Sequence, residues 1–308
     1  MRIVFFGTAN VALPILEVLN KSHQVLAVVT NPDAPAGRSG KPQESPVSAL
    51  ATDLKLKTFK PESVKNNPEF ITELKALGAD IYVVVAYGKI LPLQAINLPK
   101  FKAINVHFAA LPKYRGPSPI QAALLNGDSQ TGTSIFVLDE KVDDGPLLAQ
   151  EVVAIDPDDN YFTLSDKLAR LSAKIILPVL EGYVGGSLTP LPQDETGATH
   201  TKSITKADGK INWNKSAQEI YNQFRAFYIW PGIWTGYKGQ VLKITECIVS
   251  TTNDPRAALP GTILDGGAVA CGNGTFLQIN RLQLAGKNET GISDFLNGYR
   301  DFVGSVLN

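Results

Sequence analysis

The chain has 308 residues, of which 44% are hydrophobic, so it is long enough for two domains with sizeable cores. Its 29 Lys and Arg residues equal its 29 Asp and Glu residues in number, so net charge does not attract a polyanion and any nucleic acid must be held by local patches. Two cysteines without CxxC spacing and three scattered histidines exclude a zinc-binding motif.

The first apolar segment, MRIVFFGTANVALPILEVL, is interrupted by polar residues and falls short of the ~20 apolar residues of a membrane span. It also lacks the small-residue cleavage site of a secretory signal. We therefore expect a cytoplasmic protein without a membrane partner. We also expect a monomer, although no feature of the sequence determines the oligomeric state. In such a protein Cys247 and Cys271 are expected to be ordinary buried thiols.

Through the first part of the chain, continuous apolar runs alternate with segments of helical period. The runs predicted as strands are RIVFFG, QVLAVVTN, ADIYVVVAYG, AINVHF, TSIFVLDE and PLLAQEVVAI. Helices are predicted at about 11 to 20, near 46 to 54, and in PEFITELKALG, SPIQAALLNG and TLSDKLARLSAKIILPVLEGYV. Such alternation is typical of a mostly parallel sheet covered on both faces. We therefore predict a Rossmann-like α/β domain over residues 1–188.

The composition changes after this domain. The segment GGSLTPLPQDETGATHTKS is rich in Gly, Pro, Ser and Thr without periodicity, which predicts a linker over residues 189–206. Beyond it we expect a helix in SAQEIYNQFRAF, strands in YKGQVLKITECIV, AVACGN and GTFLQINRLQL, and a final helix in ISDFLNGYRDFV. Short strands with turn signals predict a small β-barrel domain over residues 207–308. Residues 200–308 hold 11 basic and 8 acidic residues, so this domain is the more basic one.

The opening strand, glycine and helix invite comparison with dinucleotide-binding proteins. RIVFFGTANVALP has Gly7 alone where that fingerprint needs three glycines. An NAD-linked dehydrogenase therefore stays only a remote alternative.

An asparagine and a histidine interrupt the apolar strand that begins INVHF. Residues two apart on a strand project from the same face, so Asn105 and His107 are expected side by side. The following loop, EKVDDGPLLAQ, offers Asp143 and Asp144, and loops of this kind lie at the carboxyl edge of an α/β sheet, where ligands bind. A carboxamide, an imidazole and a carboxylate together make an acid–base and oxyanion-stabilising group. The structural alternative is a buried, satisfied histidine and a polar turn closed by Gly145.

No Ser or Cys accompanies these residues as a nucleophile, which favours direct transfer between two bound substrates. The loop at residues 30–47 is long, rich in proline and basic, so it is either a solvated connector or an arm that touches an anionic partner. In RAFYIWPGIW, the group Phe227, Trp230 and Trp234 beside Arg225 is either a base-stacking platform or part of a core. Base rates for aromatic residues favour the core.

Several motifs resemble one family. NVHFAALPKYRGPSPIQ resembles the NVHxSLLPxYRGxxPI segment of folate-dependent formyltransferases, and VDDGPLLAQ is similar to their VDxG loop. ADIYVVVAYGKILP resembles their apolar strand and ILP turn. NPDAPAGRSGKPQESPV, KSITKADGKINW and RAFYIWPG resemble the branch of the family that acts on methionyl-tRNA. The matches follow the family's order over nearly the whole chain.

The resemblance implies transfer of a formyl group from 10-formyltetrahydrofolate to the α-amine of methionyl initiator tRNA, without a metal, and a second domain that is an OB-like barrel. By the same resemblance, the catalytic positions are Asn105, His107 and Asp143. The residues expected to line the folate are the backbone of Ala109, Ala110, Leu111 and Pro112 and, on the pterin side, Lys89, Ile90 and Leu91. The residues expected to contact the tRNA are Arg38 and Lys41 and lysines of the second domain such as Lys206 and Lys210.

The sequence departs from the family pattern after the histidine. Phe108 and Ala109 stand where the family has Gly and Ser, so any hydrogen bond from that serine is lost. Two alternatives therefore stay open. One is a formyltransferase that acts on an amino sugar nucleotide, and the other is a non-catalytic folate- or RNA-binding relative.

Overall fold

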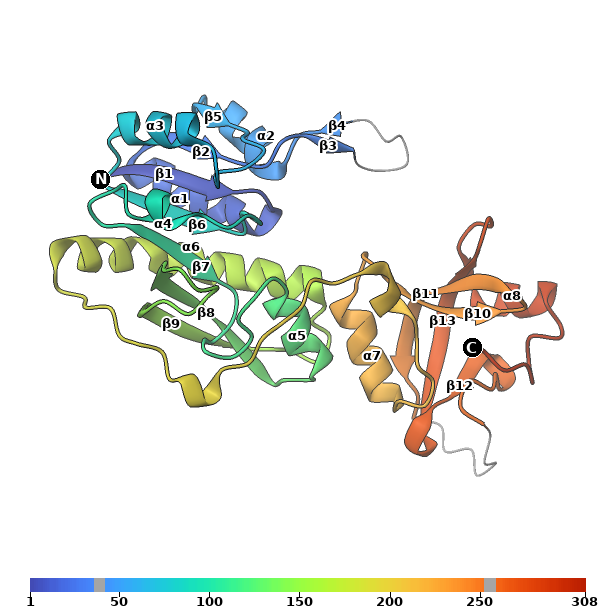
Figure 1. The fold of residues 1–308 in the computed structure, drawn as a ribbon. Coiled ribbons are helices and arrows are strands. Elements are labelled where there is room, and N and C mark those ends of the chain that lie inside the picture. Colours follow the sequence, from blue (N-terminus) through green and yellow to red (C-terminus); the bar gives the residue numbers. More distant parts are fainter. Residues whose placement is uncertain (36–41, 252–258) are drawn as a thin grey trace. The chain divides into compact units, whose positions relative to one another are not determined.

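The computed structural model describes residues 1–35, 42–251 and 259–308 (Figure 1). The chain divides into two compact units. The first consists of residues 1–119, 130–154 and 164–202, and the second of residues 120–129, 155–163 and 203–308. The domain limits given above stay a prediction.

A seven-stranded sheet forms the centre of the first unit. In sheet order its strands are β5 (Thr58–Phe59), β2 (Gln24–Val29), β1 (Arg2–Gly7), β6 (Ile81–Val85), β7 (Ala103–His107), β8 (Gln130–Val137) and β9 (Leu147–Ala154). The pairs from β5 to β7 are parallel, whereas β8 runs antiparallel to β7 and β9 antiparallel to β8. The predicted mostly parallel sheet is confirmed.

Helices cover both faces of this sheet, and its central strands are therefore buried at consecutive positions. Every residue from Ile3 to Phe6 on β1 is 0% exposed, and all five residues of β6 are buried. Side chains on a strand alternate between the two faces, so both faces of these strands must be covered. Strands that are buried on both faces are apolar at consecutive positions, and this explains continuous apolar runs such as RIVFFG and IYVVV.

Two helices of this unit, α2 and α3, begin at side-chain capping residues. Ser45 accepts a hydrogen bond from the Ser48 amide at the start of α2, and Asn67 accepts one from the Phe70 amide at the start of α3. Proline occupies the first turn of both helices. The helical segments from the N-terminus to the linker are η1 (Asn10–Ala12), α1 (Leu13–Ser22), α2 (Pro46–Asp53), α3 (Pro68–Leu77), α4 (Leu93–Ile96), α5 (Pro119–Leu125), α6 (Tyr161–Gly185) and η2 (Glu195–Gly197).

The long loop after β2 contains a small ribbon that the sequence did not indicate. Strand β3 (Ala34–Pro35) pairs antiparallel with β4 (Pro42–Gln43). Residues 36–41 between them, and with them the predicted Arg38 and Lys41, lie outside the described residues.

The second unit is built on an antiparallel sheet. Its strands are β10 (Ile233–Tyr237), β11 (Gln240–Val249), β13 (Phe276–Leu284) and β12 (Ala268–Ala270) in sheet order, with β14 (Thr290–Gly291) paired to β13. Its helical segments are η3 (Lys206–Gly209), α7 (Ala217–Ala226), η4 (Asp265–Gly267), η5 (Gly272–Gly274) and α8 (Ile292–Gly298). A small antiparallel β domain after an α/β domain is the fold class predicted from the sequence.

Two predicted elements of this unit were wrong in detail. The strand expected from Tyr237 onward is a hairpin, because Lys238 and Gly239 both have positive φ (48° and 75°), as a tight turn between β10 and β11 requires. The final helix ends at Gly298 instead of continuing to Val303, since Tyr299 leaves the helical region with φ −130° and ψ 72°.

The aromatic group of RAFYIWPGIW is divided between core and surface. Phe227 is 3% exposed and Arg225 is buried, with its guanidinium donating to the Asp159 carbonyl at 3.1 Å. Trp234 is half-buried, whereas Trp230 is 58% exposed. The assignment of the whole group to the core was therefore wrong for Trp230.

Cys247 and Cys271 are free and buried, as predicted. Among the described residues, none of the helices combines the length and the apolar character needed to cross a membrane.

Candidate active site

Asn105 and His107 lie at the carboxyl end of β7, the last parallel strand of the sheet. His107 is 6% exposed and Asn105 is half-buried. Strand β7 has β6 on one side and β8 on the other, so its backbone groups are used in the sheet and its position is fixed. The two polar side chains are therefore held by a rigid element.

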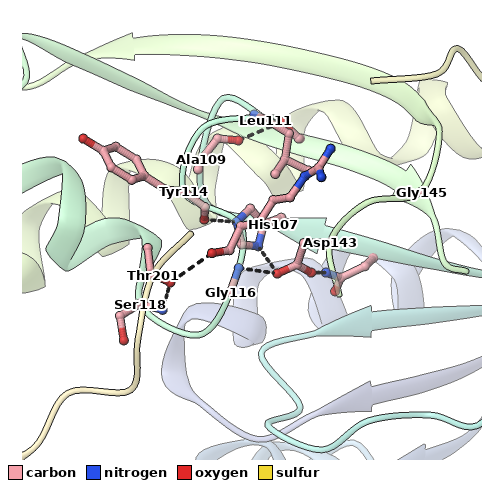
Figure 2. A network of polar contacts seen from close by, with 12 residues as sticks. His107, Ala109, Leu111, Tyr114, Gly116, Ser118, Asp143, Gly145 and Thr201 are labelled. Carbon is pink, nitrogen blue, oxygen red and sulfur yellow. Dashed lines mark hydrogen bonds and ion pairs between the residues drawn. The ribbon is translucent and has the colours of Figure 1, made fainter. Parts of the chain in front are cut away.

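Asp143 comes from the connection between β8 and β9 and lies against both residues. One carboxylate oxygen, Oδ1, accepts a hydrogen bond from Asn105 Nδ2 at 3.4 Å. The other, Oδ2, accepts one from the Gly116 amide at 2.8 Å and lies 3.6 Å from His107 Nδ1. Figure 2 shows the Gly116 amide and the His107 ring directed at this carboxylate. A carboxamide, an imidazole and a carboxylate from two separate segments thus meet at one place.

The imidazole is oriented from both sides. Its Nε2 lies 2.9 Å from the carbonyl oxygen of Tyr114, which can only accept, so Nε2 carries a hydrogen (Figure 2). Tyr114 is itself held, because its amide donates to Thr199 Oγ1 at 2.8 Å. Both ring nitrogens therefore face oxygen atoms, and the ring plane is fixed by Tyr114 on one side and Asp143 on the other.

The residues after His107 form a loop whose backbone is bonded to β8 and β9. Ser134 Oγ donates to the Ala109 carbonyl at 2.7 Å and accepts from the Leu111 amide at 3.1 Å. Gln150 Nε2 donates to the Leu111 carbonyl at 2.7 Å. Ala109 and Leu111 are buried, and Ala110 is half-buried. The segment predicted to line the folate is therefore a fixed stretch of backbone beside His107.

The residues predicted on the pterin side differ in exposure. Ile90 is 70% exposed, whereas Leu91 is 6% exposed and belongs to the hydrophobic core with Ala95 and Ile96. Lys89 Nζ donates to two backbone carbonyls of the segment before α3, at 3.0 and 2.7 Å. Of these three side chains, that of Ile90 offers apolar surface to a ligand.

Of the residues predicted to bind tRNA, Lys206 and Lys210 are described. Both are exposed and lie in or next to η3 of the second unit. The carbonyl of Lys206 accepts a hydrogen bond from Trp234 Nε1 at 3.2 Å, and Lys210 Nζ lies 6.0 Å from the centre of the Trp234 ring. The indole of Trp234 thus lies against the Lys206 backbone and near the Lys210 ammonium.

Sequence reasoning missed a charge network around Arg115, beside the site. Arg115 is 3% exposed and forms ion pairs with Asp144 at 2.6 Å and Glu195 at 2.7 Å. The hydrogen bond to Glu195 raises the pKa of the Arg115 guanidinium, and the charge of Asp144 adds to this. Burial alone raises the pKa of Asp144, but Lys141, Glu195 and Arg115 outweigh it, so that the pKa of this carboxyl is lowered. The only signal in the sequence was the arginine itself, in the YRG motif.

The described part of the chain holds no group of side chains suited to bind a metal ion. In residues 1–35, 42–251 and 259–308, no three His, Cys, Asp or Glu side chains are placed to hold a metal ion.

Comparison with known proteins gives the same family along the whole chain. Residues 1–180 match the formyl transferase family model, and residues 203–300 match the model of the formyl transferase C-terminal domain. The chain is 42% identical to the methionyl-tRNA formyltransferase of Caldanaerobacter subterraneus subsp. tengcongensis and 40% identical to that of Caldicellulosiruptor saccharolyticus, with 100% of each chain covered in both cases.

Solved structures share the fold. An N-formyltransferase from Helicobacter canadensis, in complex with folinic acid and dTDP-3-aminofucose, superposes with a TM-score of 0.65 at 19% identity, over 90% of this chain and 98% of that one. HypX from Aquifex aeolicus, in complex with tetrahydrofolic acid, gives a TM-score of 0.63 at 14% identity, over 98% of this chain and 48% of that one. At these identities the likeness concerns the fold alone. From the two domain matches and the full-length relatives, the chain belongs to the formyl transferase family.

Proposed function

We propose that this protein transfers a formyl group from 10-formyltetrahydrofolate to the α-amino group of methionyl initiator tRNA. The observation that carries the proposal is the likeness to methionyl-tRNA formyltransferases over the entire chain, at about 40% identity. The meeting of Asn105, His107 and Asp143 beside a fixed backbone loop supports it, because the reaction needs donors for a developing oxyanion and an acceptor for a proton.

In the proposed mechanism the amine attacks the formyl carbon directly. Negative charge develops on the formyl oxygen, and Asn105 Nδ2 and a ring N–H of His107 donate hydrogen bonds to it. Such donors contribute about 3–4 kcal/mol each to transition-state stabilisation. Asp143 orients His107 and accepts the amine proton, directly or through a water molecule. When the tetrahedral intermediate collapses, the bond between the formyl carbon and the folate nitrogen breaks, and that nitrogen takes up a proton and leaves as tetrahydrofolate.

The resting contacts among the three residues are long, which supports this assignment. The Asn105–Asp143 hydrogen bond is 3.4 Å and the His107–Asp143 distance is 3.6 Å, both beyond the usual 2.7–3.2 Å range. The Asn105–Asp143 hydrogen bond is therefore weak, and the 3.6 Å between His107 Nδ1 and Asp143 is too long for a hydrogen bond, so a substrate oxygen competes for Asn105 Nδ2 and for Nδ1 of His107 at little cost. By contrast, the Gly116 amide keeps Asp143 in place at 2.8 Å.

For the folate donor, we assign the backbone from Ala109 to Pro112 and the surface around Ile90. Hydrogen bonds from Ser134 and Gln150 hold the carbonyls of Ala109 and Leu111, which are buried, so the half-buried Ala110 and Pro112 are the part of this segment that a ligand can reach. The exposed side chain of Ile90 offers the apolar contact that a flat pterin ring needs. The fit therefore does not depend on the hydroxyl that Ala109 lacks.

For the tRNA, we assign phosphate contacts to Lys206 and Lys210 of the second unit and to Arg38 and Lys41, which lie outside the described residues. The exposure of the two second-unit lysines beside Trp234 supports their part. We further propose that the enzyme acts as a cytoplasmic monomer. Light scattering during size-exclusion chromatography should give one chain per particle, and a dimer mass would contradict this.

A transfer assay with radiolabelled formyl donor tests the function. The purified protein is incubated with 10-formyltetrahydrofolate and either methionyl initiator tRNA or a dTDP-linked amino sugar. We expect label on the tRNA and none on the sugar. Label on the sugar alone would show that the acceptor is an amino sugar nucleotide instead of the tRNA. Label on neither acceptor would favour a non-catalytic folate- or RNA-binding protein.

A further inference from the structure

The segment read as a linker is fixed to the first unit near the site. Leu191 and Leu147 exchange backbone hydrogen bonds of 2.7 and 2.8 Å, and the Thr201 amide donates to the Arg115 carbonyl at 2.7 Å. The chain is therefore held on both sides of Gln193, whose side chain is 9% exposed.

The Gln193 carboxamide uses all of its hydrogen-bonding capacity. Its Nε2 donates to the carbonyl oxygens of Asp143 at 2.9 Å and Gly145 at 2.8 Å. Its Oε1 accepts from Arg115 Nε at 3.1 Å and from Arg115 Nη2 at 2.8 Å. A flipped amide would set its oxygen against two carbonyls and its NH₂ against a guanidinium, so the orientation is determined by the partners.

The loop that Gln193 contacts is in an unusual conformation. Asp143 has φ 53°, in the left-handed region that residues other than glycine seldom adopt. A conformation of this kind persists only where the surroundings fix it. At Gly145, a Cβ atom would lie 1.9 Å from the Val137 carbonyl oxygen, so the loop is also pressed against β8.

The side chain and the backbone of Asp143 are held by different groups. The Gly116 amide bonds the carboxylate, whereas Gln193 bonds the carbonyls on both sides of Asp144. Arg115, next to Gly116 in the chain, pairs with Asp144 and with Gln193, so that the two supports are joined through its guanidinium.

We propose that Gln193 is a positioning residue for catalysis: its carboxamide fixes the left-handed loop that carries Asp143, and thereby sets the carboxylate against His107 and Asn105. The inference rests on the proposed function of these three residues. It gives the QDET segment a part in the reaction, although none of its side chains touches the reacting groups.

Two variants separate this role from simple attachment of the segment. Gln193→Glu keeps the length of the side chain and the acceptors for Arg115, but sets a carboxylate oxygen against the carbonyls of Asp143 and Gly145. Gln193→Met keeps the size and removes both sets of bonds. Gln278→Glu is the matched control, because Gln278 Nε2 likewise donates to two backbone carbonyls, at 2.9 and 2.8 Å, in the second unit.

The measured quantities are kcat, both KM values, the melting temperature and amide exchange in residues 139–147. For Gln193→Glu and Gln193→Met we expect kcat to fall about 100-fold, as misplacement of a catalytic group by about 1 Å produces. The KM values should stay within about threefold, because the substrates do not contact Gln193. The loop amides and that of Gly116 should exchange faster. Gln278→Glu should leave kcat and loop exchange unchanged.

Three results would overturn the inference. One is a wild-type kcat in Gln193→Glu together with a low one in Gln193→Met, which would assign the effect to the Arg115 pairing. Another is unchanged loop exchange in both variants. The third is a fall in kcat matched by loss of the folded state in both. If the wild type itself transfers no formyl group, the proposed function fails, while the exchange measurement still decides whether Gln193 fixes the loop.

Discussion

The hydroxyl group of Ser134 bonds the backbone loop after His107 at two points, Ala109 and Leu111, and its removal should be costly. Ser134 is 0% exposed and makes three hydrogen bonds: to the Ala109 carbonyl at 2.7 Å, from the Leu111 amide at 3.1 Å and from Gln150 Nε2 at 3.0 Å. Ser134→Ala leaves the Leu111 N–H without an acceptor and the Ala109 carbonyl without a donor, and both residues are buried, whereas Gln150 is exposed.

The magnitude follows from those two buried groups. An unsatisfied buried polar group costs about 1–3 kcal/mol, so two of them predict a loss of about 2–6 kcal/mol in the free energy of unfolding of the first unit. Gln150 adds little to this loss, because it is exposed and keeps its bond to the Leu111 carbonyl at 2.7 Å. The freed loop should also raise the KM for the folate donor.

Ser172→Ala is the matched control, since Ser172 is also 0% exposed. Its hydroxyl bonds Thr133 Oγ1 at 2.7 Å and the Leu168 carbonyl at 2.8 Å. After its removal Thr133 Oγ1 keeps the His107 carbonyl at 3.3 Å, and the Leu168 carbonyl keeps its place in the helix. We therefore expect a loss of about 0.5–1 kcal/mol.

The assay is urea unfolding of both variants, with the two units fitted as separate transitions. Ser134→Ala should lower the free energy of the first unit by at least about 1 kcal/mol more than Ser172→Ala does. Equal losses in the two variants would refute the reasoning, because they would show that the buried polar groups of the loop find other partners or are not confined.

Three further predictions concern other parts of the molecule. Burial raises the pKa of Cys271 to about 12 and that of Cys247 above its ordinary value, so both thiols stay protonated at pH near 8. A disulfide reagent should therefore label them only as fast as the second unit unfolds, and rapid labelling of the native protein would contradict this. Replacing Lys206 and Lys210 together by Ala should reduce the slope of log tRNA affinity against log salt by about 2, while an unchanged slope would remove both from the interface. Gly145→Ala should lower kcat strongly, since its Cβ would lie 1.9 Å from a strand carbonyl and the loop would have to shift; an unchanged kcat would show that the loop position matters little.

The parallel sheet could be predicted because its signal is local. Runs such as IYVVV are buried on both faces, and buried parallel strands are apolar at consecutive positions. The helices were predictable for a similar reason, since Ser45, Asn67 and the prolines after them mark the first turns.

The pairing of Asn105 with His107 could be expected, because the two residues share a face of one strand. The place of Asp143 was expected for the wrong reason: β8 runs antiparallel to β7 and ends opposite Ile104, at the start of β7, so the loop between β8 and β9 does not begin at the edge where β7 ends. Asp143 reaches Asn105 only through the path of that loop, which the sequence pattern does not indicate. Their catalytic roles stay a prediction.

Other features depend on contacts between distant parts of the chain. Gln193 lies 50 residues from Asp143, in a segment whose composition indicates a linker, and nothing in its local sequence shows that its carboxamide is buried. Trp230 was expected in a core because aromatic residues usually are buried, but it is exposed. The hairpin at Lys238 and Gly239 lacks the Asn-Gly or Asp-Gly pair by which such turns are commonly read.

The central claim is that the half-buried carboxamide of Asn105 and the buried imidazole of His107 catalyse formyl transfer to methionyl-tRNA, and single-turnover kinetics test it most directly. With enzyme in excess over methionyl initiator tRNA and saturating 10-formyltetrahydrofolate, the transfer rates of wild type, Asn105→Ala and His107→Ala are compared. We predict that each substitution lowers the rate at least about 100-fold while the protein stays folded. A rate equal to that of the wild type in either variant would contradict the account.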